Sequence, residues 1–253
     1  ASAVSAAPHG IRAVTAALDG SSAVVEVSTA LTGTADSVTY ELADAEGQVL
    51  ATAEGLGTVQ LAANGITPWT PETPALYTLR VTVTANGTAD TTEQRIGIRT
   101  IQVSSKTGLL LNGQPRTMKG GCIHHDLGIL GAADHAAAER RRIRLMKESG
   151  FDAIRAAHNP FGPAFLDACD ELGMLVVEEA FDEWVMGRTS FGLHVTFEQC
   201  WEKDLEDMIT RDYNHPCIVM WSTGNEVEER DGTADGFAWA KRLADKVRSL
   251  DAS

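Results

Sequence analysis

Side chains that can move protons follow each of four short apolar runs in the second half of the chain. The runs cover 117–123, 153–157, 174–177 and 217–221. The polar residues within or directly beyond them are His124, His125, Asp126, Arg155, His158, Glu178, Glu179, Asp182, Asn225 and Glu226. Carboxylates and imidazoles act as general acids and bases. We therefore predict an acid–base site at one edge of a sheet built from these runs, with coincidental loop polarity as the alternative.

Glu226 is the predicted proton donor. It follows Asn225 at the end of the apolar run that contains Ile218–Trp221. Partial desolvation beside such side chains favours the protonated form of a carboxyl group, and a general acid must hold a proton before it donates one. The alternative role, a loop carboxylate that caps a helix, fits Glu228 and Glu229 better.

Three neighbouring residues, His124, His125 and Asp126, have the side-chain types of metal ligands. Adjacent residues of a strand point to opposite faces, so the three side chains cannot all reach one ion. We therefore predict no metal at this position. One histidine should face the site and hydrogen-bond a polar substrate, while the other packs away from it.

Arg155 and the adjacent pair Glu178 and Glu179 belong to the same predicted site. Arg155 stands in an otherwise apolar strand, where it either forms an ion pair with a nearby glutamate or contacts substrate; we favour the ion pair. Its candidate partners are Glu178, Glu179 and Glu226. Alternation along a strand lets only one of two adjacent glutamates point into the site, so the other should be paired or solvated.

The elements that must position these residues alternate between strand and helix. Apolar runs alternate with helical patterns in this half of the chain, and we expect Asp134 to cap the first helix and Gly150 to end it. Strands that are apolar throughout are typical of a parallel sheet with both faces buried. A closed eight-stranded βα barrel takes ~250 residues. About four βα units are present, so we predict an incomplete (β/α)8 TIM barrel.

The first 101 residues have a different pattern. They are rich in Thr, Val, Ala and Gly, and short alternating runs are separated by turns such as Asn64–Gly65 and Asn86–Gly87. This pattern predicts an all-β sandwich, whose last strand is expected over 91–103. We predict a multi-domain chain, with a scaffold domain at 1–101 and a catalytic α/β domain at 102–253.

Composition limits the classes of partner. The 253 residues carry 21 Lys+Arg and 35 Asp+Glu, a formal net charge of −14. This balance is typical of a soluble globular protein and argues against nucleic acid and anionic membranes as partners. The start of the chain lacks the order of a secretory signal, which favours the cytoplasm but leaves the compartment open. The four cysteines lack metal-type spacing and are expected to be free thiols.

Two segments resemble the glycoside hydrolase family that contains bacterial β-galactosidases, β-glucuronidases and β-mannosidases, often called family 2. Residues 152–160, continued through 165–177, are similar to its first signature, and residues 212–226 are similar to its second, the acid/base region. Residues 1–101 resemble its immunoglobulin-like domain. The resemblance spans nearly the whole chain but only the middle of such an enzyme.

The resemblance implies a retaining β-galactosidase-like enzyme that hydrolyses terminal β-glycosidic bonds of a carbohydrate substrate. The implied roles are general acid/base for Glu226, contact with the sugar 2-hydroxyl for Asn225, lining of the substrate pocket for His124 and His158, and support of the site for Arg155. The family's nucleophilic glutamate comes from a seventh strand, which lies outside this chain. The isolated chain is therefore expected to be inactive.

The loop after the third apolar run departs from some members of the family. In those members a glutamate and a histidine there help to bind magnesium; Glu183 matches the glutamate, but Val185 replaces the histidine. We therefore predict no cofactor. Asp182 and Trp184 in this loop are predicted sugar contacts, as is Asp126, and a core position is the alternative for Trp184.

Two other readings of the chain stay open on sequence alone. The chain could be a non-catalytic carbohydrate-binding or scaffold module, or the parent enzyme could be a β-glucuronidase or a β-mannosidase. Two half-barrels could also pair as a homo-oligomer, in which case light scattering would give twice 27.0 kDa.

Overall fold

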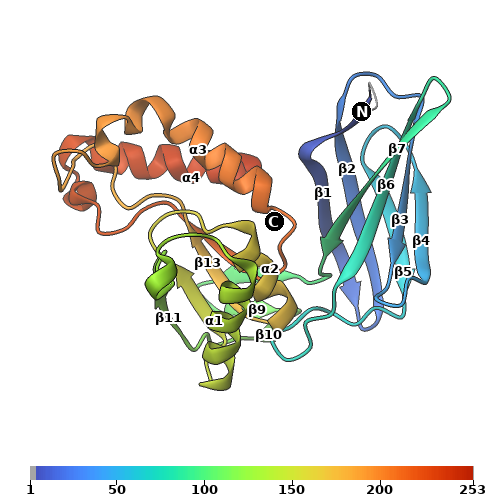
Figure 1. Cartoon of the computed structure of the whole chain (residues 1–253), viewed down its shortest axis with the longest axis horizontal. Coiled ribbons are helices and arrows are strands. Elements are labelled where there is room, and N and C mark those ends of the chain that lie inside the picture. The colour runs from blue at the N-terminus through green and yellow to red at the C-terminus, as the bar shows by residue number, and fades with distance from the viewer. Residues whose placement is uncertain (1–3, 253) are drawn as a thin grey trace. The chain divides into compact units, whose positions relative to one another are not determined.

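The computed structural model describes residues 4–252, which form two compact units (Figure 1). One unit comprises Ala1–Thr117 with Asn214–Pro216, and the other comprises Met118–Tyr213 with Cys217–Ser253. Residues 102–117 thus group with the N-terminal unit. Among the described residues, no helix is long and apolar enough to cross a membrane.

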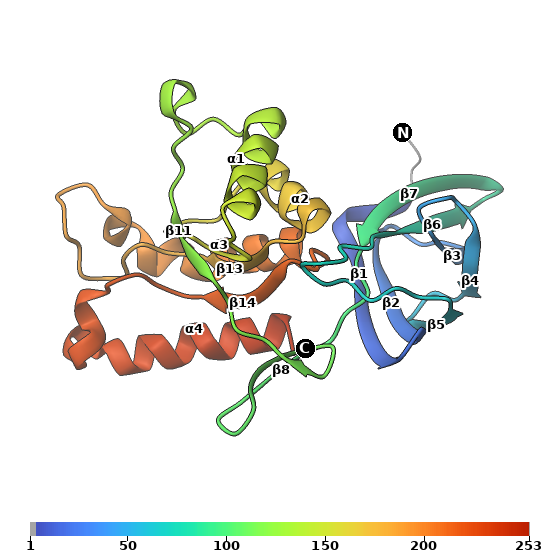
Figure 2. The ribbon, with the colours of Figure 1, turned by 90° about the horizontal axis from the view of Figure 1, so that it is seen from below.

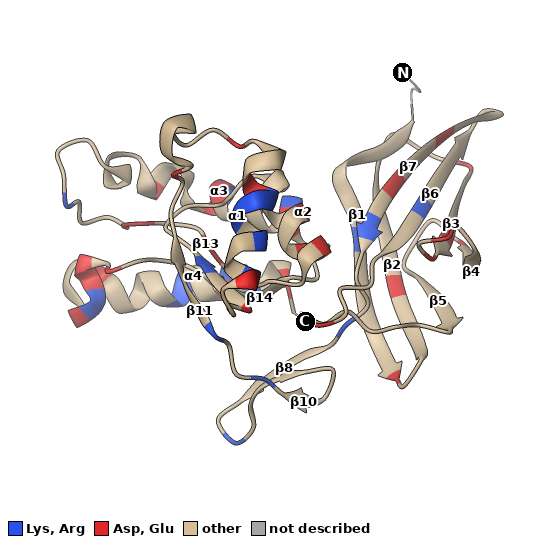
Figure 3. Ribbon diagram, turned by 60° about the horizontal axis from the view of Figure 1, so that its bottom comes forward, with Lys and Arg blue, Asp and Glu red and all other residues tan. Residues whose placement is uncertain are grey.

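The N-terminal unit is an antiparallel β-sandwich. The sheet order β1-β2-β5 joins Ser5–Asp19, Ser22–Thr32 and Val59–Asn64; the order β4-β3-β6-β7 joins Val49–Glu54, Ser37–Ala43, Tyr77–Ala85 and Thr88–Ile96. Alternate residues of β2 and β6 are buried, as the period-two geometry of a strand requires. Charged residues are sparse on these strands (Figure 3). The predicted sandwich is confirmed.

A smaller sheet follows, with β8 (Ile101–Ser104), β9 (Gly108–Leu111) and β10 (Gln114–Pro115) in the order β10-β9-β8. The single strand predicted over 91–103 is wrong, because the ladder with β6 stops at Ile96. The carbonyl of Ile98 accepts the backbone N–H of Trp69, and the N–H of Thr100 donates to the side chain of Asn112. These hydrogen bonds give backbone groups of Ile98 and Thr100, between β7 and β8, partners outside any sheet.

The C-terminal unit contains a four-stranded parallel sheet in the order β11-β12-β13-β14. Figure 2 labels three of its strands, β11, β13 and β14. Its strands are Gly120–Ile123, Ala153–Ala156, Leu175–Glu179 and Ile218–Ser222. Because all four strands run in the same direction, their carboxyl ends share one edge of the sheet. β11 and β14 are its outer strands, so the barrel is not closed, and the predicted incomplete barrel is confirmed.

Four α-helices accompany this sheet: α1 (Ala136–Glu148), α2 (Pro163–Leu172), α3 (Phe197–Asp212) and α4 (Gly236–Leu250). Short 3-10 turns η1 to η4 cover Gly128–Leu130, Leu193–Val195, Glu228–Asp231 and Thr233–Asp235. Helix α1 packs on α2 and α3 packs on α4 (Figure 1). The second pair encloses an apolar cluster that includes Phe197, Leu205 and Trp239.

The helix ends test the predicted caps. Gly150 follows α1 with a φ of 87°, a conformation that favours glycine after a helix, as predicted. The predicted cap at Asp134 is wrong, because the N-cap of α1 is His135 and makes no side-chain hydrogen bond there. The carboxylate of Asp134 instead accepts the N–H of Ala164 in the first turn of α2, at 3.4 Å. The capping group therefore serves a neighbouring helix.

Candidate active site

A buried carboxylate at the end of β13 connects three consecutive strands. Glu179 is fully buried and accepts four hydrogen bonds. Arg155 of β12 donates from Nε at 3.1 Å and from Nη2 at 2.7 Å, Nδ1 of His158 lies at 2.7 Å, and Oγ of Ser222 on β14 donates at 2.6 Å. A buried charge is tolerated only when it is paired and hydrogen-bonded, and this one has both kinds of partner. Of the partners predicted for Arg155, the structure selects Glu179.

Asn225 is held from both ends of its side-chain amide. Its Oδ1 accepts from Nη2 of Arg155 at 2.9 Å, and its Nδ2 donates to Oδ1 of Asp182 at 2.9 Å. The two bonds fix which way the amide points. Partial burial raises the pKa of Asp182, but hydrogen bonds from Asn225 and Arg188 outweigh it, so the pKa is lowered from its ordinary value. Asp182 is therefore ionised at neutral pH.

Glu226 lies next to this network but in a different environment. Its side chain is 80% exposed, its φ is 41°, and its Oε2 is 3.8 Å from Nη1 of Arg188. The expected desolvation by Ile218–Trp221 is absent in this structure. The physical reason is that, within residues 4–252, β14 pairs only with β13 and no further strand covers the edge beside Glu226.

The two neighbouring histidines behave as strand alternation predicts. The ring of His124 lies edge-on to that of His158, with 5.0 Å between centroids. The ring of His125 stacks on Phe161 at 3.9 Å, and its Nε2 lies 3.2 Å from the carbonyl oxygen of Pro160. His124 is thus the histidine on the side of the Glu179 network.

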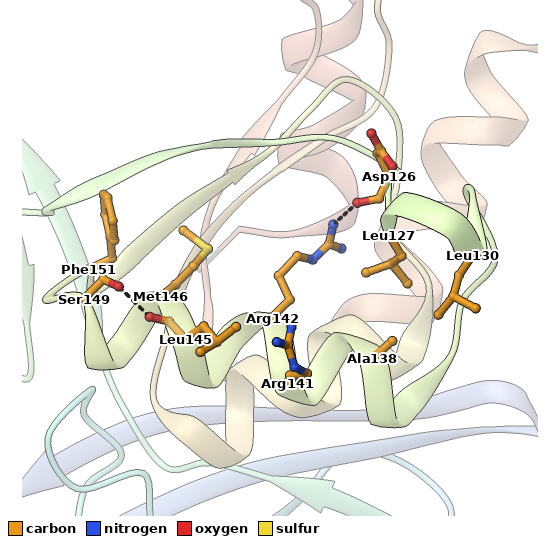
Figure 4. A pocket seen from close by; sticks show the side chains of 10 residues that line it. All are labelled: Asp126, Leu127, Leu130, Ala138, Arg141, Arg142, Leu145, Met146, Ser149 and Phe151. Carbon is orange, nitrogen blue, oxygen red and sulfur yellow. Dashed lines mark hydrogen bonds between the residues drawn. The ribbon is translucent and has the colours of Figure 1, made fainter.

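Asp126 lies in the loop before α1. Its hydrogen bonds to Gly128 and Arg142 do not reach the group formed by Glu179, Arg155, His158 and Ser222. Its Oδ1 accepts the N–H of Gly128 at 2.7 Å, and its carbonyl accepts from Arg142 at 3.2 Å. The residue lines a cavity of about 480 Å³ beside α1. Figure 4 shows Leu127 and Leu130 at this cavity together with Asp126. The substrate role of Asp126 stays a prediction.

Trp184 and Glu178 both point into the interior. Trp184 is 6% exposed, belongs to the apolar cluster under α3 and α4, and donates from Nε1 to the carbonyl of Thr223 at 2.8 Å. This burial favours the core alternative for Trp184. Glu178 accepts the N–H of Phe161 at 2.7 Å. Burial, together with the nearby charge of Asp212, raises its pKa well above the ordinary value and so favours the neutral form of Glu178.

The sequence analysis missed two polar residues of this region, Arg188 and His194, and assigned no role to Ser222, which follows the fourth apolar run. The signal for Ser222 was available, because residues at matching positions of neighbouring parallel strands lie side by side, and Ser222 is opposite Glu179. Arg188 and His194 belong to the segment between β13 and α3, which has no regular periodicity. Their approach to Asp182 and Glu183 depends on how that segment folds.

Family models match both parts of the chain. Residues 101–253 match the model described as glycosyl hydrolases family 2, TIM barrel domain, and residues 11–99 match the model described as glycosyl hydrolases family 2. The chain belongs to glycosyl hydrolases family 2. The resemblance inferred from the two signature segments is thereby confirmed.

Curated family 2 relatives extend well beyond this chain. A β-galactosidase, BoGH2A, from Bacteroides ovatus is 38% identical over 244 residues, which cover 89% of this chain and 29% of the relative. A β-galactosidase from Vibrio cholerae is 32% identical over 228 residues, covering 81% of this chain and 22% of the relative. The chain thus spans less than a third of the length of either relative.

Solved structures agree with the family assignment. A family 2 member from Bacteroides cellulosilyticus superposes with a TM-score of 0.91 at 34% identity, covering 97% of this chain and 34% of that one. A β-D-glucuronidase from Dictyoglomus thermophilum superposes with a TM-score of 0.81 at 26% identity, covering 96% of this chain and 42% of that one. The sandwich and the partial barrel of this chain therefore each have a fold found in family 2.

Proposed function

We propose that the full-length protein to which this chain corresponds is a retaining β-glycosidase that hydrolyses terminal β-galactosides, with Glu226 as its general acid/base. The observation that carries the proposal is the placement of Glu226 beside Asn225, whose amide is fixed by Arg155 and Asp182 at the carboxyl edge of the sheet. In βα barrels catalytic groups lie at this edge.

The proposed chemistry uses Glu226 twice. Its protonated carboxyl donates to the glycosidic oxygen as the bond to the anomeric carbon breaks, and its carboxylate later takes a proton from the water that releases the sugar. Asn225 has used one lone pair of its oxygen and one N–H of its amide on protein partners. An amide carries two of each, so one acceptor site and one donor stay free for the sugar 2-hydroxyl.

Several other site residues have proposed supporting roles. We assign contact with the sugar to His124, His158 and Asp182, which surround Asn225 and Glu179, and orientation of Asn225 to Arg155. Retention needs a second carboxylate about 5 to 5.5 Å from the acid. Glu179 is unsuited to that attack because it is buried and already accepts four hydrogen bonds. The proposed nucleophile lies outside residues 1–253, so the isolated chain is inactive.

The remaining features of the proposal concern partners and organisation. We favour a β-galactoside because the matched relatives named above include two β-galactosidases, and a β-glucuronide is the second candidate because a β-D-glucuronidase has the same fold. We propose the division 1–101 and 102–253 for the two domains, with no cofactor and no nucleic-acid or membrane partner. We also propose that the full-length protein is cytoplasmic and forms a homo-oligomer.

The test compares Glu226→Gln with the unchanged full-length enzyme on nitrophenyl β-galactoside and nitrophenyl β-glucuronide. Loss of a general acid should lower kcat by ~10² to 10⁴-fold. The loss in kcat/KM should be much smaller on a dinitrophenyl glycoside, because kcat/KM reports the first step and that leaving group departs without a proton. Glu228→Gln is the matched control, since Glu228 contacts only the exposed side chain of Arg230 at 3.9 Å among its described ion pairs. Equal kcat for Glu226→Gln and Glu228→Gln would refute the proposal.

A further inference from the structure

One guanidinium group stands among three carboxylates at the edge of the site. Nη2 of Arg188 lies 2.6 Å from Oδ1 of Asp182, its Nη1 lies 3.8 Å from Oε2 of Glu226, and its Nε lies 4.0 Å from Oε2 of Glu183. Arg188 comes from the segment after β13, and Glu226 comes from the segment after β14. Arg188 therefore joins the neighbourhood of the proposed acid/base to the loop that carries Asp182.

The surroundings of Glu183 show whether a magnesium ion fits here, as it does in some members of the family. Oε2 of Glu183 accepts the backbone N–H of Arg188 at 3.0 Å. Its Oε1 accepts the backbone N–H of His194 at 3.1 Å and lies 3.0 Å from Nδ1 of the same residue. A carboxylate has about four lone-pair sites, and three of those on Glu183 face nitrogen atoms. Burial raises the pKa of Glu183, but these hydrogen bonds outweigh it and lower the pKa.

The backbone also fills the space around Glu183. A Cβ atom added at Gly192 would overlap Oε1 of Glu183, and one added at Gly187 would overlap the ring of His194. The chain therefore passes as close to these two side chains as glycine allows. Magnesium requires near-octahedral oxygen ligands at about 2.0 to 2.1 Å and usually keeps several water molecules. A hydrated ion of that kind has no room at Glu183.

Charge leads to the same conclusion. Two unit charges about 4 Å apart interact by roughly 4 kcal/mol near a protein surface, and a divalent ion between Glu183 and Glu226 would meet the Arg188 guanidinium at about that separation. Two of the three nitrogen atoms that face Glu183 belong to backbone N–H groups, which cannot bind a cation. The residues present therefore do not fit magnesium.

We propose that Arg188 is a positioning residue that supplies, from the protein itself, the positive charge between Glu183 and Glu226. The inference rests on the proposed acid/base role of Glu226. When Glu226 gives its proton to the leaving oxygen, the guanidinium at 3.8 Å stabilises the carboxylate that forms. Arg188 and Asn225 both bond the carboxylate of Asp182. Asp182 therefore links the guanidinium of Arg188 to the amide that is proposed to contact the sugar.

The segment that carries Arg188 is anchored close to it. Glu229, which is fully buried, accepts the backbone N–H of Met186 through Oε1 at 2.5 Å. Met186 lies two residues before Arg188, and Glu229 lies three residues after Glu226. This bond ties the two segments together next to the Arg188–Glu226 pair. The backbone two residues before Arg188 is therefore bonded to the segment that follows Glu226.

The experiment uses the full-length enzyme with Arg188→Ala and Arg188→Lys. Arg188→Ala should lower kcat on nitrophenyl β-galactoside by ~10² with KM changed less than threefold, as loss of a preorganised electrostatic group does. Guanidine hydrochloride at millimolar concentration should raise the kcat of Arg188→Ala at least tenfold. Arg188→Lys should have a higher kcat than Arg188→Ala. Arg230→Ala is the control, because Arg230 contacts Glu228 in the neighbouring turn; its kcat should be unchanged.

Metal dependence is measured on the same preparations. The kcat of the unchanged enzyme should fall by less than twofold in EDTA. Calorimetric titration with magnesium chloride should show no binding at this site. The inference is overturned if EDTA abolishes activity and magnesium restores it, if Arg188→Ala stays within twofold, or if its loss is not rescued by guanidine, as for a purely structural residue. Failure of the acid/base assignment is separate, because it appears as an active Glu226→Gln enzyme.

Discussion

Replacing Glu179 by glutamine should weaken the folded state and the site together. The change keeps the size of the side chain but removes the charge that Arg155 faces at 2.7 Å. Breaking a buried pair by removing one partner costs about 3 to 5 kcal/mol. The Arg155 side chain is 34% exposed, so water offsets part of this cost, and glutamine keeps one acceptor oxygen. We expect a loss of about 2 to 3 kcal/mol in the free energy of unfolding.

The chain offers a matched control in Glu93→Gln. Glu93 forms the same kind of bond with Arg80, at 2.9 Å, but its side chain is 56% exposed. Exposed pairs contribute about 0 to 1 kcal/mol. At roughly 2 to 4 °C per kcal/mol, calorimetry of the full-length enzyme should show the transition of the barrel lowered by about 4 to 12 °C for Glu179→Gln. The transition of the sandwich, which carries Glu93 on β7, should fall by much less for Glu93→Gln.

Kinetics provide the second measurement for Glu179→Gln. Nη2 of Arg155 bonds both Glu179 and Asn225, so loss of one bond should loosen the amide that is proposed to contact the sugar. We expect kcat/KM for nitrophenyl β-galactoside to fall by about 10-fold, the effect of roughly one hydrogen bond. A transition temperature and a kcat/KM indistinguishable from those of Glu93→Gln would refute the reasoning.

Two further outcomes follow from buried groups near the site. The pKa of Glu178 is raised well above its ordinary value by burial and by Asp212; above about pH 4.3 the unfolded chain loses the proton that the folded chain keeps, so stability falls as pH rises. Glu178→Gln should therefore raise the transition temperature more at pH 8 than at pH 5, and an equal or larger gain at pH 5 would contradict this. Gly192→Ala places a methyl group against Oε1 of Glu183 and should cost about 1 to 3 kcal/mol of stability. Gly57→Ala, which has open space for its Cβ, is the control, and an equal effect of the two would show that the loop has room.

The sequence predicted the sheet, and the polar side chains at its carboxyl edge, because both follow from short-range pattern. Apolar runs with β-strand length define β12, β13 and β14, and the residue after a run must lie at its carboxyl end. Alternation also separated His124 from His125. Arg155 could be assigned to an ion pair but not to one partner, since the choice of Glu179 depends on the register between β12 and β13.

Features that depend on the path of irregular segments were not predictable. Asp134 has the type and position of a cap for α1, but the turn before α2 brings Ala164 to its carboxylate. Arg188 has no periodic pattern to mark it, and it approaches Glu226 through the fold of an irregular segment that Glu229 bonds at Met186. The exposure of Glu226 depends on what lies beyond β14, which local sequence does not specify.

The Glu179 network has a practical consequence for changing which sugar the enzyme accepts. Because Arg155, His158 and Ser222 each bond the same buried carboxylate, a substitution at any one of these positions removes a partner of Glu179 and should weaken the folded state. Exposed His124 is free of that constraint. Libraries for new specificity should therefore diversify the outward-facing positions and keep the Glu179 group intact.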